Sequence, residues 1–193
     1  MHMAQVKVKK FKVFPRGLTI AYIGDGKGKT TAAVGAAVRA RGYGMRVAFL
    51  QFYKSLEWPS GERSALKKLG VHVEVLGKGF VGILGDRKKR SEHTVAAVQA
   101  LERAWGVVSS GQYDLVVLDE VISCLEQKLF PVARVTALIN KRARHAKAKK
   151  VHIVLTGHTR FPAVLALCDL VTEMKMMKHP YYDGFLAVRG VDF

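Results

Sequence analysis

Six short apolar runs divide the chain, and longer segments with apolar residues at helical spacing separate them. The runs occupy residues 18–23, 46–52, 71–76, 114–119, 151–156 and 169–174. Most are rich in Val, Ile and Leu, which is typical of strands buried on both faces of a sheet. The intervening pattern predicts helices at residues 30–41, 91–110, 131–145 and 161–167. Strands that alternate with helices in this way predict a parallel, doubly wound α/β sheet.

The predicted sheet places the candidate site residues at one edge. In such sheets, ligands bind beyond the carboxyl ends of the strands, and the first, second and fourth strands lead directly into polar residues there. Loops are expected at residues 53–61, 77–90 and 178–184, and a final apolar strand after Tyr182. One stripe of the longest predicted helix carries Val95, Val98, Leu101, Trp105 and Val108. We expect this stripe to face the sheet.

The size of the chain suits one globular domain with a buried core, since it has 193 residues and 49% hydrophobic content. We assign residues 17–193 to this domain and residues 1–16 to a basic segment that could be an edge strand or a flap. Residues 1–3 could be left over from cloning. No apolar run of about 18 residues predicts a membrane-spanning helix. Residues 1–10 lack the apolar stretch of a secretory signal, so we expect a cytoplasmic protein.

The charge of the chain indicates which class of ligand it binds. It has 32 basic and 15 acidic residues, a formal net charge of +17. Such a charge favours anionic ligands, whether a nucleotide, a nucleic acid or a phosphate-bearing cofactor. The basic clusters at residues 87–90 and 141–150 lack interleaved aromatic residues for base stacking. We therefore interpret them as solvated surface.

The segment GDGKGKTT, residues 24–31, follows a predicted strand and opens a predicted helix, as a phosphate-binding loop does. It departs from the usual pattern G-x-x-x-x-G-K-S/T because its first glycine comes one residue late. Lys29 can lie along the phosphates, Thr30 can offer a hydroxyl to Mg²⁺, and Lys27 adds a second cation. Its glycines allow a close backbone approach to phosphate, and they are Gly24, Gly26 and Gly28.

Two further motifs follow predicted strands. The fourth strand ends in Asp119 and Glu120, which could be counter-ligands for a Mg²⁺–triphosphate. The second of these carboxylates could instead activate water in a hydrolase. The stretch QFYKSLEWPSGE, residues 51–62, follows the second strand and suits a ligand with flat and polar parts. Its Trp58 could equally be a packing residue.

As an ordered set, these motifs resemble the ATP:corrinoid adenosyltransferases of the P-loop type, from about residue 17 to residue 193. The resemblance is carried by GDGKGKTTAA, QFYKSLEWPSGE, GKGF, VVLDE, LTGH with DLVTEM, and KHPYYDG with the final DF. It implies a single RecA-like α/β domain, with a mostly parallel sheet and helices on both faces. It also implies transfer of the 5′-deoxyadenosyl group of ATP to Co(I) of a reduced corrinoid, with release of triphosphate, in adenosylcobalamin biosynthesis or salvage.

The resemblance also implies roles for particular residues. Members share the shortened loop and are understood to hold ATP with its triphosphate reversed. Charge on the leaving triphosphate would be stabilised by Lys27, Lys29 and Arg39. Mg²⁺ or Mn²⁺ would be held by Thr30 and Glu120, with Asp119 in support. The corrinoid would contact Trp58, Phe80, Lys178 and His179. ATP would be bound by Gly24, Asp25, Gly26, Lys27, Gly28, Lys29, Thr30, Thr31, Gln51, Lys54 and Glu62.

The implied partners are an external electron donor, most simply a reduced flavoprotein, and a second copy of the chain in a homodimer. Two positions depart from the family. Gly82 stands where well-known members carry a tryptophan, so Val81, Ile83 and Leu84 would have to build the corrinoid wall. His158 replaces an arginine, and Arg160 could compensate for it. The alternative function is a RecA-like, nucleic-acid-stimulated ATPase, which rests on the charge and on the same two nucleotide motifs.

Overall fold

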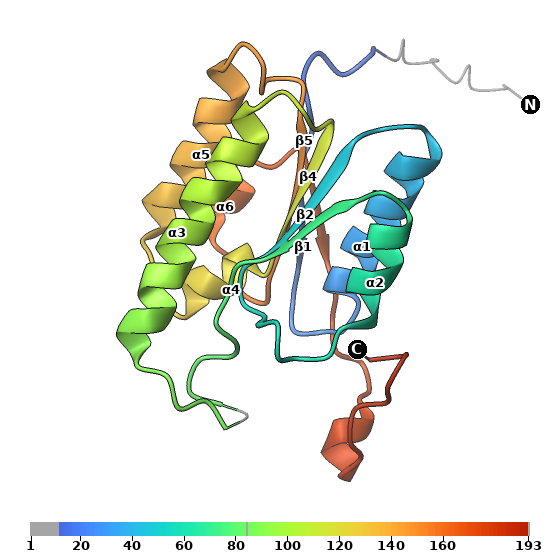
Figure 1. Ribbon diagram of the computed structural model, residues 1–193, viewed down its shortest axis with the longest axis vertical. Coiled ribbons are helices and arrows are strands. Elements are labelled where there is room, and N and C mark those ends of the chain that lie inside the picture. Colours follow the sequence, from blue (N-terminus) through green and yellow to red (C-terminus); the bar gives the residue numbers. More distant parts are fainter. Residues whose placement is uncertain (1–11, 84, 193) are drawn as a thin grey trace, which may run out of the picture.

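The computed structural model describes residues 12–83 and 85–192, and its centre is one parallel sheet (Figure 1). The six strands lie in the order β3-β2-β4-β5-β1-β6. Each predicted apolar run contains one strand, so the predicted α/β sheet is confirmed. The strands are β1 (Thr19–Ile23), β2 (Val47–Gln51), β3 (His72–Val75), β4 (Leu115–Asp119), β5 (His152–Thr156) and β6 (Leu170–Glu173).

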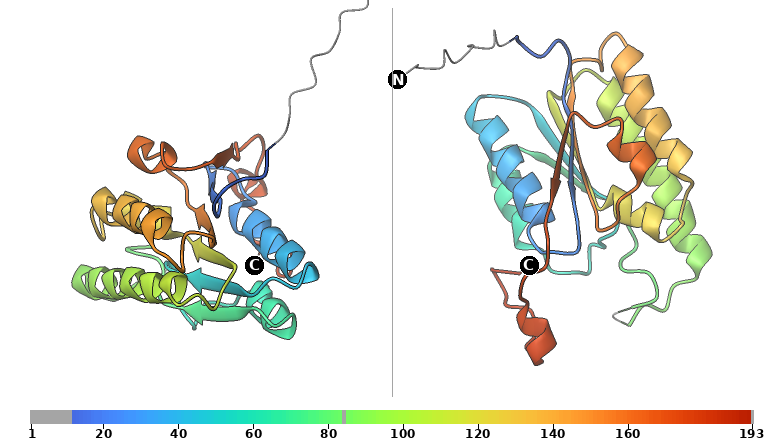
Figure 2. Two further views of the ribbon diagram at one scale, coloured as in Figure 1. Left: turned by 90° about the horizontal axis from the view of Figure 1, so that it is seen from above. Right: turned by 180° about the vertical axis from the view of Figure 1, so that it is seen from behind.

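Helices cover both faces of the sheet, as predicted (Figures 1 and 2). On one face lie α1 (Lys29–Gly42) and α2 (Gly61–Lys68). On the other lie α3 (Arg90–Ser109), α4 (Val121–Glu126), α5 (Val132–Arg144) and α6 (Pro162–Leu165). Two clusters of buried apolar residues fill the layers between helices and sheet. Among the described residues, no helix is both long enough and apolar enough to cross a membrane.

The longest helix, α3, packs on the core with part of the predicted stripe. Leu101 and Val108 are buried, and Val98 and Trp105 are partly buried against the core, whereas Val95 is 55% exposed. Small side chains allow a helix to approach a sheet closely, so the centre of the packed face is rich in alanine, which the predicted stripe did not include. The buried residues are His93, Ala96, Ala97, Ala100, Leu101, Ala104, Val107 and Val108.

Two short helices leave no periodic signal in the sequence. Helix α2 has only 8 residues and α4 only 6, so neither is long enough to repeat an apolar pattern over several turns. The prediction of a final strand after Tyr182 is wrong. A 3₁₀-helix, Pro180–Asp183, is followed by residues 185–188, which form no strand. Their side chains have no neighbouring strand to pack against, and Leu186 is 88% exposed.

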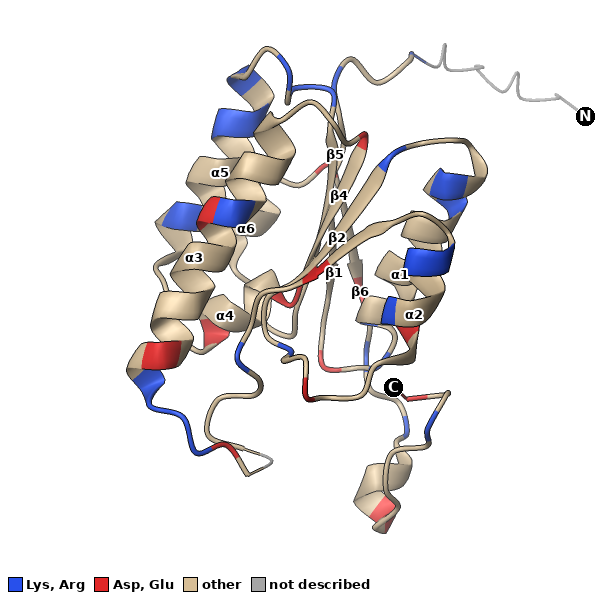
Figure 3. Ribbon diagram, viewed as in Figure 1, with Lys and Arg blue, Asp and Glu red and all other residues tan. Residues whose placement is uncertain are grey.

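The basic segment 141–150 is not wholly solvated as predicted, because Arg142 is fully buried. Its guanidinium donates hydrogen bonds to the Gly17 and Val151 carbonyl oxygens and to the Thr19 hydroxyl. Arg142 therefore ties α5 to the amino end of the sheet. Other basic residues are spread over several elements, including α1, α5 and the loop before α3 (Figure 3). Most of the basic N-terminal segment, residues 1–11, lies outside the described residues, as does Leu84.

Candidate functional site

The glycine-rich loop between β1 and α1 is held against the segment that follows β6. The Gly26 N–H donates to the Met174 carbonyl oxygen at 2.8 Å, and the Gly24 N–H donates to the His158 carbonyl oxygen at 3.0 Å. Gly24 has a φ of 111°, and a Cβ there would lie 2.2 Å from the Met174 oxygen. Only glycine fits this position, so the shortened loop is fixed by its neighbour in the sheet.

Lys29 begins α1 and is almost completely buried, with 6% of its surface exposed. Its Nζ donates a hydrogen bond to the Gly26 carbonyl oxygen at 2.8 Å, within the loop itself. Burial lowers the pKa of Lys29, and the negative charges of Glu120 and Asp25 partly oppose that shift. The loop therefore carries a poorly solvated ammonium group that would gain from an anionic ligand.

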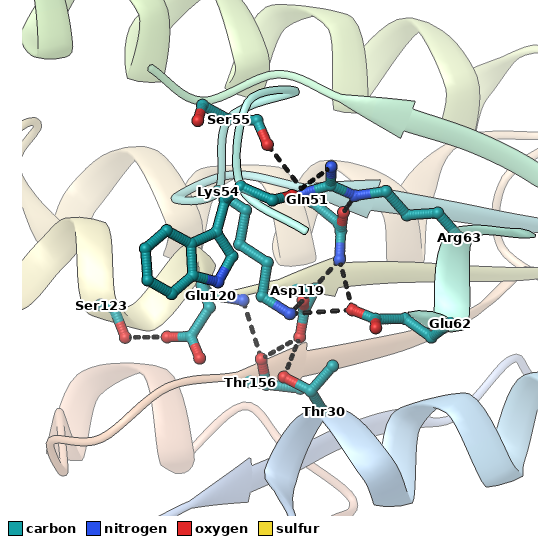
Figure 4. A network of polar contacts seen from close by, with 11 residues as sticks. Thr30, Gln51, Lys54, Ser55, Glu62, Arg63, Asp119, Glu120, Ser123 and Thr156 are labelled. Carbon is teal, nitrogen blue, oxygen red and sulfur yellow. Dashed lines mark hydrogen bonds and ion pairs between the residues drawn. The ribbon is translucent and has the colours of Figure 1, made fainter. Parts of the chain in front are cut away.

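Asp119 lies at the centre of a buried network at the end of β4 (Figure 4). Its Oδ1 accepts hydrogen bonds from the hydroxyls of Thr30 and Thr156, both at 2.9 Å. The side chain is fully buried, and this burial, with the nearby charge of Glu120, raises the pKa of Asp119 to about 6. The network joins the phosphate loop, β4 and β5. Thr156 was not among the predicted site residues. Its place as a polar residue at the carboxyl end of a predicted strand is the signal that could have identified it.

Glu120 follows Asp119 in a left-handed backbone conformation, with a φ of 63°. Its N–H donates to the Thr156 hydroxyl at 2.7 Å, and the Ser123 hydroxyl donates to its carboxylate. The unusual conformation, which costs on the order of 1 kcal/mol for a residue other than glycine, separates Glu120 from the buried Asp119. Of these two adjacent carboxylates, only Glu120 lines the pocket described below.

A second polar group lies beyond β2 and at the start of α2 (Figure 4). Glu62 accepts hydrogen bonds from Lys54 at 2.9 Å and from Gln51 at 3.1 Å. Burial alone would raise the pKa of Glu62, but the hydrogen bond and charge of Lys54, together with further hydrogen bonds to the carboxylate, outweigh burial and lower the pKa to about 2. Arg63 donates to the Gln51 side chain at 2.7 Å and to the Trp58 carbonyl oxygen at 3.0 Å. Sequence reasoning missed Arg63 because it missed α2.

Several of these groups line a pocket of about 850 Å³ at the carboxyl ends of the strands. Most of the predicted site residues line it. Several unpredicted residues also line it, including His158 and the C-terminal residues Gly190, Val191 and Asp192. The predicted residues in its lining are Asp25, Gly26, Lys27, Gly28, Lys29, Thr30, Thr31, Lys54, Glu62, Phe80, Glu120 and His179.

Other predicted residues lie elsewhere. Gln51 and Asp119 are buried beneath the pocket, and Lys178 lines an adjoining cavity of about 990 Å³ formed mainly by residues 175–192. Arg39 does not line either cavity. It is exposed on α1, ten residues from Lys29, or about 15 Å along the helix axis. Within one chain, Arg39 is therefore too distant to act on a ligand that Lys29 holds.

The structure shows the surroundings of the positions at which the sequence departs from the family pattern, His158 and Gly82, and of Arg160. Arg160 is paired with Glu173 on β6, with Nε and Oε1 2.9 Å apart, and it does not line the pocket. It therefore does not substitute there for the missing arginine, whereas His158 is in the lining. Gly82 has a φ of 69° and open space around its Cβ position. Ile83 is 56% exposed, so it forms no packed wall.

An aromatic cluster reaches the pocket through one of its members, Phe80. The Phe80 ring meets the rings of Tyr53 and Trp58 edge to face, with centroids 5.5 and 5.3 Å apart. The Val81 N–H donates to the Tyr53 hydroxyl at 3.1 Å. Phe80 lines the pocket, and Trp58 supports it from behind. Tyr53 is buried and was not among the predicted site residues.

The site offers oxygen donors to a metal ion, the type of ligand that Mg²⁺ prefers. They are the Thr30 hydroxyl and the carboxylate of Glu120, which line the pocket, with the carboxylate of Asp119 buried behind Thr30. Within residues 12–83 and 85–192, no group of three or more His, Cys, Asp or Glu side chains gathers in a way that could hold a metal. Mg²⁺ needs only one or two protein ligands when phosphates and waters supply the others, so the donor set fits a nucleotide-bound ion.

Sequence comparison finds similar proteins along nearly the whole chain. The family described as ATP:corrinoid adenosyltransferase BtuR/CobO/CobP matches residues 15–193. The corrinoid adenosyltransferase of Escherichia coli (strain K12) is 34% identical over 178 residues, which cover 92% of this chain and 86% of that protein. Corrinoid adenosyltransferase CobA of Salmonella typhimurium has the same identity and coverage. A Sinorhizobium corrinoid adenosyltransferase is 33% identical over 193 residues, covering 98% of this chain and 86% of that protein.

Structure comparison supports the fold. The crystal structure of the KaiC-like protein PH0186 from Pyrococcus horikoshii matches with a TM-score of 0.53 and 18% identity. The match covers 86% of this chain and 76% of that one. At this level of identity the likeness concerns the fold alone. The predicted RecA-like α/β domain is confirmed.

Proposed function

Because this chain belongs to the ATP:corrinoid adenosyltransferase family, we propose that its pocket transfers the 5′-deoxyadenosyl group of ATP to Co(I) of a reduced corrinoid. A cobalt–carbon bond forms while the bond between the ribose 5′-carbon and its oxygen breaks. Triphosphate leaves with the electron pair of the broken bond. Co(I) supplies both electrons of the new bond, so the step needs no general base from the protein.

The observation that carries this proposal is one pocket with two chemically different sides. Lys27, Lys29 and the loop backbone form a cationic side, and Phe80 belongs to an aromatic side of the same pocket. The cationic side suits a triphosphate. The aromatic ring of Phe80 suits contact with the apolar face of a large macrocycle such as a corrinoid.

We propose that the shortened loop presents the ribose 5′-carbon, and not the γ-phosphorus, to the attacking atom. A kinase or ATPase must expose the γ-phosphorus, so the opposite orientation would be needed here. Lys27, Lys29 and the loop N–H groups would then stabilise the charge that grows on the departing triphosphate. The tight packing of Gly24 and Gly26 on residues 174–175 supports a preorganised loop, since it leaves the backbone little room to move.

Thr30 and Glu120 would hold Mg²⁺, with Asp119 behind them. The Thr30 hydroxyl donates a hydrogen bond to Asp119, which leaves the lone pairs of the hydroxyl oxygen for a cation. When bound, the ion would neutralise part of the negative charge of the triphosphate. Glu62 and Lys54 line the same pocket as an ion pair and would contact the nucleoside or the phosphates.

The proposal includes three features of the protein in the cell. A cytoplasmic reduced flavoprotein would supply the electron that generates Co(I), and the net charge of +17 suits an acidic partner. The protein would act as a homodimer, which the exposed apolar residues Leu170 and Val171 on the edge strand β6 support. The corrinoid would be cob(I)alamin or cob(I)yrinic acid a,c-diamide, in salvage or biosynthesis.

An anaerobic assay tests this function. Chemically reduced cobalamin, ATP and Mg²⁺ are mixed with the protein, and the cobalt–carbon bond is followed by its light-sensitive absorption spectrum. We expect a spectrum that reverts on illumination and that requires both ATP and protein. The alternative, a nucleic-acid-stimulated ATPase, predicts no spectral change and instead ADP and phosphate formation, stimulated by DNA or RNA and suppressed by salt.

A further inference from the structure

The loop between β3 and α3, residues 77–89, is fastened by one buried carboxylate. Asp86 accepts hydrogen bonds from the Gly82 N–H at 2.9 Å, the Lys88 N–H at 3.1 Å and His93 Nε2 at 2.9 Å. The side chains of Asp86 and His93 are only 6% and 2% exposed. His93 belongs to the first turns of α3. The Asp86–His93 pair therefore joins the loop to the body of the protein.

Among the described residues, the other polar contacts of this half of the loop include the hydrogen bond from the Asp86 N–H to the Ile83 carbonyl oxygen and the exposed Lys88–Glu57 ion pair at 3.7 Å. Gly82, Gly85 and Arg87 are exposed, and the two glycines have left-handed backbones with φ of 69° and 78°. Glycine has more conformations open to it than other residues, so such a segment stays ordered only if something holds it. The hydrogen bonds to Asp86 keep this segment ordered. They also lower the pKa of the Asp86 carboxyl.

The fastened segment continues directly into the aromatic side of the pocket. Gly82, whose N–H is bound by Asp86, follows Val81, whose N–H is bound by the Tyr53 hydroxyl. Phe80 comes next toward the amino end, and its ring lines the pocket. Residues 80–82 are thus held on one side by Tyr53 and on the other by Asp86. If the contact with Asp86 is lost, Phe80 would keep only the Tyr53 hydrogen bond to Val81 and its ring contacts with Tyr53 and Trp58.

We propose that Asp86 and His93 are positioning residues that hold the loop of Phe80 in the shape that receives the corrinoid. The inference rests on the proposed function, because it assigns the aromatic side of the pocket to the macrocycle. Neither residue lines the pocket, so they act through Phe80 and not by contact with substrate. A loop that must become ordered when a ligand binds lowers the affinity for that ligand. The phosphate-binding loop lies on the other side of the pocket, so the affinity for ATP should not change.

Steady-state kinetics of adenosyl transfer test this proposal. Asp86→Ala and His93→Phe should each raise the KM for reduced cobalamin about tenfold, the effect of losing a charged hydrogen bond. The KM for ATP should change less than twofold. His93→Gln keeps an N–H donor and should recover most of the affinity for cobalamin. The control is Glu102→Ala, an exposed position on the same helix, which should match the wild type.

The outcomes separate this inference from the proposed function. If the wild type transfers no adenosyl group, the proposed function fails and this inference fails with it. If the wild type is active and both Asp86→Ala and His93→Phe keep the wild-type KM for cobalamin, only this inference is overturned. An equal rise in both KM values would show a merely structural role and would also overturn it. Should Asp86→Ala fail to fold, His93→Phe carries the same test, since it keeps a buried ring and removes one hydrogen bond.

Discussion

The ammonium group of Lys27 is paired with the carboxylate of Asp192, which joins the phosphate loop to the C-terminal end of the described chain. The other oxygen of Asp192 accepts the Val188 N–H at 2.7 Å, so the carboxylate is itself held in place. Both residues line the candidate nucleotide pocket. In the free protein, one of the two loop cations is therefore bound to a carboxylate that an incoming triphosphate would have to displace.

Replacing Asp192 with asparagine should tighten ATP binding. The substitution removes the competing negative charge but keeps an oxygen that can accept the Val188 N–H. Because Lys27 is half exposed, we expect a decrease in the Kd for ATP of only about two- to fivefold, as for an ion pair near the surface. Isothermal titration calorimetry at low ionic strength measures this.

Asp183→Asn is the matched control, because Asp183 is an exposed aspartate of the same C-terminal segment. It changes the net charge equally but should leave the Kd for ATP unchanged. Equal tightening in both variants would mean that general electrostatics and not release of Lys27 is responsible. Weaker binding in Asp192→Asn would mean that Asp192 contributes to the nucleotide site.

Lys29→Ala should abolish most adenosyl transfer, with a loss in kcat/KM of roughly 100- to 1,000-fold, as for other groups that stabilise developing charge. Lys27→Ala should cost less, because Lys27 is more exposed than Lys29. Initial rates of cobalt–carbon bond formation give both values. Near-normal transfer by Lys29→Ala would remove the loop from the mechanism.

Glu62 should make stability depend on pH. Its pKa is about 2 in the folded protein, below the ordinary value of 4.5, so its contribution is present above 4.5 and is lost as the pH falls toward 2. The free energy of unfolding of the wild type relative to Glu62→Gln should fall by about 2 kcal/mol between about pH 6 and pH 3.

Urea unfolding at a series of pH values measures this difference. Glu57→Gln is the control, since Glu57 belongs to the same segment but its side chain is 82% exposed. Its difference from the wild type should stay nearly constant across the range. A constant difference for Glu62→Gln as well would show that the Lys54–Glu62 ion pair does not stabilise the fold.

Thr30→Val should raise the Mg²⁺ concentration for half-maximal activity by about tenfold or more, because it removes a proposed metal ligand. Thr30→Ser retains the hydroxyl and should resemble the wild type. Rates of adenosyl transfer at saturating ATP, measured across a Mg²⁺ titration, distinguish the two. A Thr30→Val variant with a reduced rate but an unchanged Mg²⁺ requirement would contradict the metal role.

The parts of the fold and site that follow from local sequence were predictable. The strands are continuous apolar runs, and the phosphate loop is a short motif between a strand and a helix, so Lys29, Thr30 and Glu120 were predicted together and line one pocket. The packing of a helix through small side chains could not be predicted in the same way. The alanine face of α3 packs on the sheet because of its shape, which a hydrophobic pattern does not record.

Contacts between residues far apart in the sequence could not be predicted either. Asp192 comes to the site from 165 residues away, and nothing near it in the sequence marks it as a partner of Lys27. Arg63 and Asp86 gain their roles from the residues they bind, not from a motif of their own. Arg39 shows the converse, since the family pattern placed it in the site but its position on α1 keeps it away within one chain.

Phosphorus NMR of the reaction products tests the central claim most directly, namely that carbon and not phosphorus is attacked in this pocket. The protein is incubated anaerobically with ATP, Mg²⁺ and chemically reduced cobalamin, and the spectrum is recorded as adenosylcobalamin accumulates. We expect one equivalent of tripolyphosphate for each adenosylated corrinoid. ADP and orthophosphate as the products, with no tripolyphosphate and no adenosylcobalamin, would contradict it.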